Sequence, residues 1–253
     1  MKIRVLTINL HKGFSPLHRR FVLPQLSSSI HSYHSDIVFM QEVVGENTKK
    51  AAKHKNWPAM QQDEYIASEA GFDYVYGKNA VYAFGHHGNA ILSRYPILFF
   101  DQIDISTNRF EKRGMLYARL KLPERGACLH CICIHLGLLY RSRKKQMLKM
   151  RKYIEKIVPK NEPLIVAGDF NEWRRKKKNE LETSLLMKDA GLELYGHKLR
   201  TFPSVLPLFP LDRIYLRGFK VIEARIMQKD ACGCLSDHAG FFAEVEQTPL
   251  LTP

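Results

Sequence analysis

PLIVAGDFNEWRRKKK (residues 163–178) joins a short apolar segment to a polar pair and then to a run of five basic residues. The part at 163–170 is too short for a typical helix and has the composition of a buried strand. Asp169 and Asn171 stand two residues apart at its end, so their side chains can face the same way. Because an unpaired carboxylate at the edge of an apolar core is costly, the stretch predicts a strand that ends in a polar site.

Short apolar segments of the same kind recur along the whole chain. They lie at 3–10, 36–42, 88–94, 114–122, 128–136, 163–170, 211–216 and 240–246. Helical periodicity appears at 20–33 and 142–158, and more weakly at 180–190. Many strands with a few helices between them predict an α/β fold in which helices cover a sandwich of two β-sheets.

The composition is that of one globular domain. Hydrophobic residues make up 45% of 253 positions, which is enough for a large core, and no Pro/Gly/Ser-rich tract divides the chain. We therefore predict a single domain at 1–247 with a short C-terminal tail at 248–253, and we expect a monomer. No apolar stretch is long enough to span a bilayer, no signal peptide is visible, and the odd number of cysteines, five, indicates reduced thiols; these features favour a cytoplasmic location.

The charge balance favours a partner that carries phosphate. Lys and Arg number 39 against 25 Asp and Glu, which gives a net charge of +14. A field of this sign attracts nucleic acid, nucleotides and anionic lipid headgroups, and by itself it does not choose among them. The basic runs at 141–145 and 174–178 follow predicted strands and should be loops or helix starts.

A residue able to bind metal or phosphate stands at or near an end of nearly every predicted strand. The set comprises Asn9, Glu42, His135, Asp169, Asn171, Asp212, Asp237 and His238. Turns and caps explain any one of these residues but not all of them together. A phosphoryl-transfer site does explain the set, because Mg²⁺ takes a few hard oxygen ligands and the phosphoryl centre needs an activated water, neutralised oxygens and a proton for the leaving oxygen.

Seven short motifs follow one another from the first predicted strand to the last. They are NLH (9–11), QE (41–42), GNAILSRYPI (88–97), IHLG (134–137), GDFN (168–171), LDRIY (211–215) and SDH (236–238). In this order they resemble the endonuclease/exonuclease/phosphatase superfamily, which includes DNase I-like nucleases, neutral sphingomyelinases and inositol-polyphosphate phosphatases. The resemblance covers almost the full chain, and it implies a four-layer α/β/β/α sandwich with a divalent-metal phosphoesterase site.

The resemblance also implies a metal site for Mg²⁺ (or Mn²⁺). Glu42 of the QE motif corresponds to the metal ligand, with Asn9 and Asp237 as helpers. Arg113, in the segment EKRG, stands where the DNase I branch has an arginine that reaches phosphate, although EKR could equally be a solvated turn. With Asn9 and Asn171, Arg113 would bind the substrate.

Catalytic roles follow from the resemblance in the same way. Asp169 would position and deprotonate the attacking water, and Asn171 would hold a phosphate oxygen. His238, oriented by Asp212, would neutralise the phosphorane or take part in proton transfer, and His135 resembles the second histidine of the DNase I and sphingomyelinase branches. The residue types support the pairing independently, because a carboxylate on one ring nitrogen fixes the tautomer of a histidine and stabilises its charged form.

Several substrate classes stay open. The charge and the two basic runs favour nucleic acid, whereas His135 and the apolar loop at 201–212 favour a phospholipid or sphingomyelin-type diester. An inositol-phosphate phosphatase ranks third, because no paired-arginine signature is recognisable. A non-catalytic module that binds anionic polymers or membranes is a further class, and a nucleotide switch is disfavoured because no GxxxxGK[ST] loop is present.

Four weaker features have two interpretations each. His86 and His87 could reach the substrate or a metal, but a polar loop is the simpler interpretation. Trp173 should be a buried packing anchor or a wall of the site. The loop at 201–212, TFPSVLPLFPLD, could pack onto the sheets, which we favour, or form an exposed apolar lip. Lys12 could lie near phosphate or be solvated.

Overall fold

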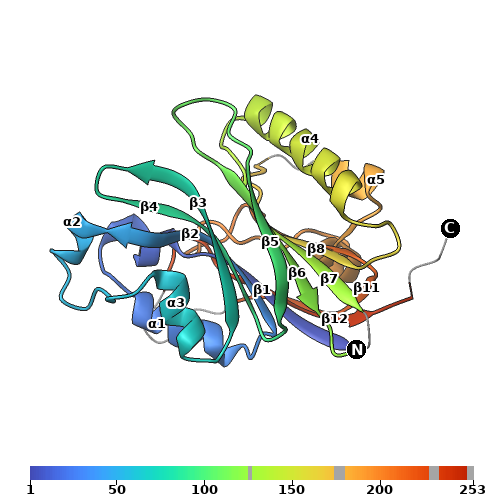
Figure 1. The fold of residues 1–253 in the computed structure, drawn as a ribbon, viewed down its shortest axis with the longest axis horizontal. Coiled ribbons are helices and arrows are strands. Elements are labelled where there is room, and N and C mark those ends of the chain that lie inside the picture. The colour runs from blue at the N-terminus through green and yellow to red at the C-terminus, as the bar shows by residue number, and fades with distance from the viewer. Residues whose placement is uncertain (125–126, 174–179, 228–233, 250–253) are drawn as a thin grey trace.

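Two β-sheets lie face to face in the computed structural model, which describes residues 1–124, 127–173, 180–227 and 234–249 (Figure 1). The first sheet comprises β1 (Lys2–Asn9), β2 (Ile37–Asn47), β3 (Asp73–Tyr82), β4 (Gly85–Ser93), β11 (Phe219–Ile226) and β12 (Phe241–Gln247). The second sheet comprises β5 (Ile97–Asp104), β6 (Gly114–Lys121), β7 (Cys128–His135), β8 (Leu164–Asp169), β9 (Lys188–Asp189) and β10 (Asp212–Arg217). The strand orders are β11-β12-β1-β2-β4-β3 and β5-β6-β7-β8-β10-β9.

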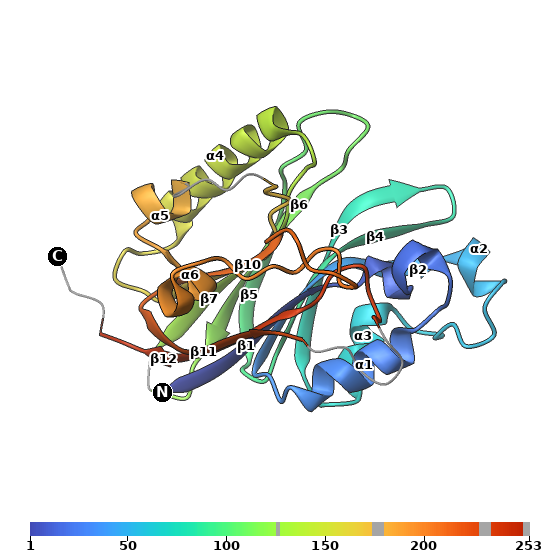
Figure 2. The ribbon, with the colours of Figure 1, turned by 180° about the vertical axis from the view of Figure 1, so that it is seen from behind.

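Helices cover the outer faces of both sheets. The helical elements are η1 (His11–Gly13), η2 (Pro16–His18), α1 (Leu23–Ser32), α2 (Thr48–Ala51), α3 (Gln62–Ser68), α4 (Tyr140–Ile157), α5 (Glu180–Ser184) and α6 (Ala190–Tyr195). α1 and α3 lie outside the first sheet, and α4 and α5 lie outside the second (Figures 1 and 2). The predicted α/β/β/α sandwich is therefore confirmed. Among the described residues, no helix is both long and apolar enough to cross a membrane.

Period-two alternation along the strands separates the core between the sheets from the two cores under the helices. In β7, Cys131 and Cys133 face the first sheet, whereas Ile132 and Ile134 pack in the cluster that includes residues of α4. Side chains of β8 also point alternately to the two faces of its sheet, and because both faces are covered, all six residues are buried. A strand that is buried on both faces can place polar groups only at its ends, and this brings Asp169 to the edge of the sandwich.

Strand pairing brings the ends of distant segments together. β7 runs parallel to β8 and pairs His135 with Asp169, while β10 runs antiparallel to β8 and pairs Asp212 with Asp169. In the first sheet, the parallel pair β1 and β2 sets Asn9 beside Gln41. Sheet register thus gathers the polar strand ends at one edge.

Some predicted elements differ from those observed. β3, β5 and β11 were not among the predicted strands, and the predicted helix at 180–190 is wrong as a single element. Leu186 has a left-handed backbone (φ 52°) that ends the helical segment, and a short strand precedes α6. The polar loop expected at His86 and His87 is also wrong, because both residues belong to β4 and pair with β2 and β3. The basic run at 141–145 begins α4, whereas 174–178 lies outside the described residues.

The GDFN motif needs a glycine at position 168 because the backbone of β7 passes close to it. Its φ is 144°, and a β-carbon added there would lie 2.0 Å from the carbonyl oxygen of Ile134. We expect Gly168→Ala to lower the free energy of unfolding by about 2–4 kcal/mol, because it combines backbone strain with overpacking. Urea unfolding measures the loss. Gly71→Ala is the matched control, since Gly71 also has a positive φ (64°) but no neighbouring atom within 4 Å of the added carbon; equal losses in the two variants would contradict the argument.

Candidate active site

A cavity of about 220 Å³ opens at the edge where the polar strand ends meet. Its polar lining consists of Asn9, Glu42, Arg113, His135, Asp169, Asn171, Asp237 and His238. Asp212, the remaining residue of the predicted site, lies behind His238 and contacts it. The structure therefore brings together every side chain that the sequence singled out for the site. The volume suits a phosphate group with its immediate substituents and leaves the rest of a larger substrate outside.

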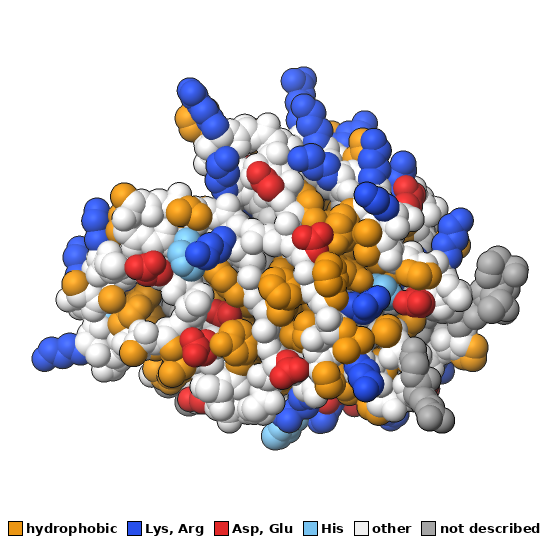
Figure 3. Space-filling view, in the orientation of Figure 1, with side chains coloured by type: hydrophobic (Ala, Val, Ile, Leu, Met, Phe, Trp, Pro, Cys, Tyr) orange, Lys and Arg blue, Asp and Glu red, His pale blue; other side chains and the backbone are white. Residues whose placement is uncertain are grey.

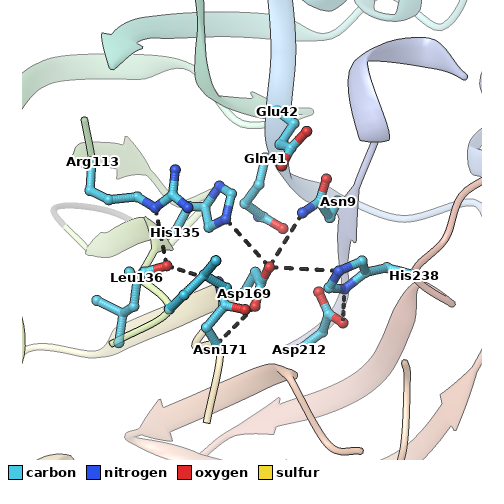
Figure 4. Close-up of polar contacts among 12 residues, drawn as sticks. Asn9, Gln41, Glu42, Arg113, His135, Leu136, Asp169, Asn171, Asp212 and His238 are labelled. Atoms are coloured by element: carbon cyan, nitrogen blue, oxygen red, sulfur yellow. Dashed lines mark hydrogen bonds and ion pairs between the residues drawn. The ribbon is translucent and has the colours of Figure 1, made fainter. Parts of the chain in front are cut away.

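Asp169 is the centre of this cluster (Figure 4). Its Oδ2 atom accepts a hydrogen bond from Asn9 Nδ2 at 3.3 Å and lies 3.5 Å from His135 Nε2 and 3.8 Å from His238 Nε2. Its Oδ1 atom accepts a hydrogen bond from the Asn171 backbone N–H at 2.9 Å. Burial raises the pKa of Asp169 to about 7, against the opposing influence of the His238 cation. The carboxylate can therefore exchange a proton near neutral pH.

His238 and Asp212 form a buried pair. His238 Nδ1 donates to Asp212 Oδ2 at 2.7 Å, and the Thr201 hydroxyl donates to the same oxygen at 2.6 Å. Burial alone would lower the pKa of His238, but the carboxylates of Asp212 and Asp169 outweigh it and raise the pKa to about 10. His238 is therefore an imidazolium at neutral pH, with both ring nitrogens protonated. Thr201 was not singled out in the sequence, because a threonine at the start of a proline-rich loop carries no signal.

Asp169, Asp212 and His238 also offer ligand atoms that lie within 4.8 Å of one another, which is close enough for a metal ion. An imidazolium has no free lone pair to donate to a metal, and the Asp212 hydrogen bond stabilises that charged form. The hydrogen bond from His238 Nδ1 to Asp212 favours proton chemistry for these three side chains, and Glu42 with its neighbours is the other candidate site for a cation.

Glu42 is placed by a break in β2 rather than by the end of a strand. β2 continues to Asn47, the pairing with β4 shifts between Met40 and Val43, and Glu42 has a left-handed backbone (φ 53°). Such a bulge turns a side chain out of the regular alternation, and strained backbone of this kind clusters at functional sites. The sequence expectation of a strand-end glutamate is corrected here, although the side chain does line the cavity.

The ionised form of Glu42 is favoured by neighbouring basic side chains. Burial would raise the pKa of Glu42, but His135, Lys12, His87 and His11 lower it to about 2. Lys12 Nζ lies 3.5 Å from Glu42 Oε2, so Lys12 pairs with this carboxylate rather than lying free in solvent. Glu42 is therefore fully ionised at neutral pH.

The oxygen atoms around Glu42 fit a hard divalent cation. Asn9 and Asp237 line the same cavity, and their amide and carboxylate oxygens are the ligand type that Mg²⁺ prefers. The Gln41 Oε1 atom is buried and has no hydrogen-bond partner among the described residues. Since buried polar atoms are rarely left unpaired, this orphaned acceptor is consistent with a cation or its water shell beside β2.

Arg113 reaches the cavity from the loop between β5 and β6. Its Nε donates to the Leu136 carbonyl at 3.2 Å, and its Nη2 donates to Glu111 Oε1 at 3.1 Å. The Asn171 side chain donates to the same Leu136 carbonyl at 2.8 Å, so one backbone oxygen aligns both residues. The alternative of a solvated EKR turn does not describe this geometry. Glu111, which also accepts from the Leu138 N–H at 3.0 Å, is a positioning residue that the sequence did not reveal.

His135 and His87 are neutral histidines beside the cavity. Burial, aided by Arg113, holds the pKa of His135 well below its usual range. Burial also lowers the pKa of His87 to about 4, with Lys12 adding to the shift. A neutral imidazole can accept or donate a single hydrogen bond without adding charge to the site.

Trp173 forms part of the wall of the cavity. It is 37% exposed and contacts the rings of Phe202 and Phe209 edge-on, at 5.6 and 5.0 Å between centroids. The expectation of a buried anchor is therefore wrong, and the alternative of a site wall describes Trp173.

Comparison with known proteins gives one consistent family. The profile of the Endonuclease/Exonuclease/phosphatase family matches residues 6–238. The uncharacterized protein YbhP of Escherichia coli (strain K12) is 40% identical over 242 residues, 96% of this chain and 95% of that protein. Sphingomyelinase C of Leptospira interrogans is 26% identical over 166 residues, 58% of this chain and 29% of that protein. The crystal structure of an endonuclease/exonuclease/phosphatase from Bacteroides vulgatus has the same fold, with a TM-score of 0.76 at 19% identity over 98% of this chain and 99% of that one.

Proposed function

Because the chain belongs to the endonuclease/exonuclease/phosphatase family, we propose that it is a phosphodiester hydrolase that depends on Mg²⁺ or Mn²⁺. The family as a whole consists of phosphoesterases, and the finer assignment rests on one observation. Asp169 Oδ2 lies within 3.8 Å of Asn9, His135 and His238 in the lining of a small polar cavity. A buried carboxylate in such a setting can accept a proton from water beside a bound phosphate.

Glu42, Asn9 and Asp237 would hold the cation. When bound, a divalent cation neutralises charge on the phosphate oxygens. The ionised Glu42 supplies the negative charge that such a site needs. The buried Gln41 Oε1 atom, which has no hydrogen-bond partner among the described residues, offers a further oxygen to the cation or its water. Lys12 offsets the Glu42 charge at 3.5 Å in the free protein.

Each of the remaining residues has a proposed role at the phosphate. Asp169 positions and deprotonates the attacking water, and Asn9 orients Asp169 through its amide. The His238 imidazolium, with Nδ1 held by Asp212, faces the reacting phosphate with Nε2 and stabilises the charge that develops there. Asn171 and Arg113 bind non-bridging oxygens, and the neutral His135 offers a further hydrogen bond.

Removal of the metal should abolish turnover. After treatment with EDTA, hydrolysis of bis(p-nitrophenyl) phosphate should cease and return with added Mg²⁺ or Mn²⁺. Glu42→Gln should raise the Mg²⁺ concentration for half-maximal turnover by roughly tenfold or more, because it removes the charged ligand. Calorimetric titration with Mg²⁺ checks binding without relying on activity. Glu46→Gln, on the exposed part of the same strand, should leave both measurements unchanged, and an unaffected Glu42→Gln would refute the metal assignment.

Two substrate classes have specific support. Nucleic acid is favoured by the net charge of +14, and a phospholipid or sphingomyelin-type diester by the exposed leucines of the loop at 201–212. A panel of plasmid DNA, single-stranded RNA, sphingomyelin, phosphatidyl lipids and inositol phosphates separates these classes. Binding of anionic polymers or membranes that depends steeply on salt, without metal-dependent turnover, would instead favour the non-enzymatic module.

The cytoplasmic location and the monomeric state are parts of the same proposal. Cys131 and Cys133 are buried and free, which suits a reducing compartment. Sedimentation of the purified protein measures its oligomeric state.

A further inference from the structure

Large apolar side chains stand exposed on several segments around the mouth of the active site. Six of them, here called the apolar rim, are between 47% and 85% exposed: Leu17, Phe110, Leu138, Leu139, Leu206 and Leu208. Single exposed apolar residues are common on protein surfaces, but a group of them around one opening marks an interaction site.

Contacts with the cavity place these segments beside its mouth. Leu138 lines the cavity, and its N–H donates to Glu111, which joins the loop after β7 to the loop that carries Phe110. The Ser204 N–H donates to the carbonyl of Asp237 at 2.8 Å, which fixes the loop of Leu206 and Leu208 beside the site.

The turn that carries Leu17 reaches the same mouth from the first sheet. The neighbouring ring of His18 stacks on His11 at 4.1 Å, and His11 Nε2 lies 3.7 Å from Asp237. Rim residues thus lie near the cavity on both halves of the sandwich.

Exposed cations lie close in sequence to the rim residues outside the loop at 201–212. Arg19 and Arg20 follow Leu17, and Arg109 and Lys112 flank Phe110. Beyond Leu139, α4 begins with a further set of exposed cations, Arg141, Lys144, Lys145 and Lys149. Figure 3 shows Lys and Arg side chains gathered over α4 and the adjoining loop. Apolar tips among basic residues are the composition of surfaces that insert into the interface of an anionic bilayer.

Two other occupants fit these residues less well. Single-stranded nucleic acid is bound on aromatic platforms, and five of the six rim residues are leucines, which offer no ring for a base to stack on. A second copy of the chain would bring the same cations into opposition, and the net charge of +14 disfavours that contact. An anionic lipid surface satisfies both the apolar and the cationic components.

We propose that the apolar rim docks this protein on an anionic phospholipid membrane, so that the active site faces a phosphodiester presented at the membrane surface. This inference rests on the proposed phosphodiester hydrolysis, and it places the substrate of that reaction at a membrane surface. The small cavity accepts a phosphate group, while the leucines enter the boundary between headgroups and acyl chains. Docking would align the headgroup phosphate with Asp169.

The test measures binding to vesicles of equal parts phosphatidylcholine and phosphatidylglycerol by co-sedimentation at physiological ionic strength. The double variant Phe110→Ser/Leu206→Ser should raise the dissociation constant roughly tenfold or more, because two inserted side chains are lost. Vesicles of phosphatidylcholine alone should bind the wild type more weakly. The matched control is Leu98→Ser, which removes a 49% exposed leucine near the start of β5, at the end remote from the loop of Phe110, and should bind as the wild type does.

The outcomes separate docking from catalysis. Turnover of the soluble bis(p-nitrophenyl) phosphate should be equal in the wild type, the double variant and the control, because no rim residue that is changed lines the cavity. Absence of soluble turnover in the wild type would overturn the proposed function. Vesicle binding that is absent, or that is unaffected by the double variant, would overturn the docking surface. So would a rim-dependent affinity for single-stranded DNA or a rim-dependent dimer in sedimentation.

Discussion

Asp169→Asn should reduce the turnover of a soluble phosphodiester by about 10³-fold or more, since it removes the group proposed to deprotonate water. The substitution keeps the shape of the side chain and the acceptor oxygen for the Asn171 N–H. Burial raises the pKa of this carboxyl to about 7, so the exchange removes a desolvation cost, and Asp212 remains as the hydrogen-bonded partner of His238. The measurements are turnover with saturating Mg²⁺ and thermal unfolding of the same preparation.

A matched exchange elsewhere separates catalysis from a general effect of the substitution. Asp73→Asn changes an exposed carboxylate at the start of β3, far along the sheet from the cavity, and should retain wild-type turnover. Full activity in Asp169→Asn would remove the central residue of the proposed mechanism. Loss of activity together with a large fall in the unfolding temperature would instead assign Asp169 to the structure of the strand end.

The sequence predicts which residues form the site better than it predicts how they are arranged. Asp169, Asn171, His135 and His238 were found because carboxylate, amide and imidazole groups at the ends of apolar strands have no role in a core. Their convergence at one edge depends on strand order, since β8 lies between β7 and β10, and that order is set by long-range pairing.

The position of the Glu42 side chain could not be predicted from local sequence patterns. Its motif was recognised, but the shift in pairing and the φ of 53° that turn its side chain toward the cavity arise from the fit of β2 against β4. The contact of Lys12 with Glu42 likewise follows from a turn with left-handed residues rather than from spacing in the chain. Positioning residues such as Glu111 and Thr201 were missed for the same reason.

The strands missed in the sequence have a common physical cause. β3 and β5 are edge strands, with residues exposed to solvent along much of their length, so their hydrophobic patterns are weak. β11, the other edge strand of the first sheet, has a register shift between Val221 and Glu223, so the buried positions Phe219, Val221 and Ala224 do not follow one period-two pattern. Central strands with continuous apolar runs were all recognised.

The cavity holds opposite charges in a fixed arrangement before any substrate binds. Glu42 is ionised beside Lys12, while Asp169 lies next to a histidine that two carboxylates keep charged. In water, solvent dipoles would have to reorganise to stabilise the charge that develops during the reaction. Here the charged side chains at the strand ends are already oriented to do so. A phosphate entering between Arg113 and His238 would meet positive groups on its oxygens and a proton acceptor on the side of Asp169.

Asp212→Asn should lower turnover at pH 8 by about 10²–10³-fold, approaching the effect of His238→Ala. The carboxylates of Asp212 and Asp169 raise the pKa of His238 to about 10 against the effect of burial, so the wild type should keep its imidazolium until the pH nears that value. Without the Asp212 charge, burial lowers this pKa, and the cation is lost at a lower pH. The alkaline limb of the pH profile should therefore move to lower pH by about one unit or more.

Thr201→Val distinguishes the charge of Asp212 from its position. This variant removes the hydroxyl that donates to Asp212 Oδ2 at 2.6 Å but keeps the carboxylate beside His238, so the alkaline limb should stay in place and turnover should fall only slightly. A shift of the limb in Thr201→Val as large as that in Asp212→Asn would show that orientation, rather than charge, governs the histidine. An Asp212→Asn profile with the wild-type limb would mean that Asp169 alone sustains the imidazolium, because it is the other buried carboxylate that His238 faces.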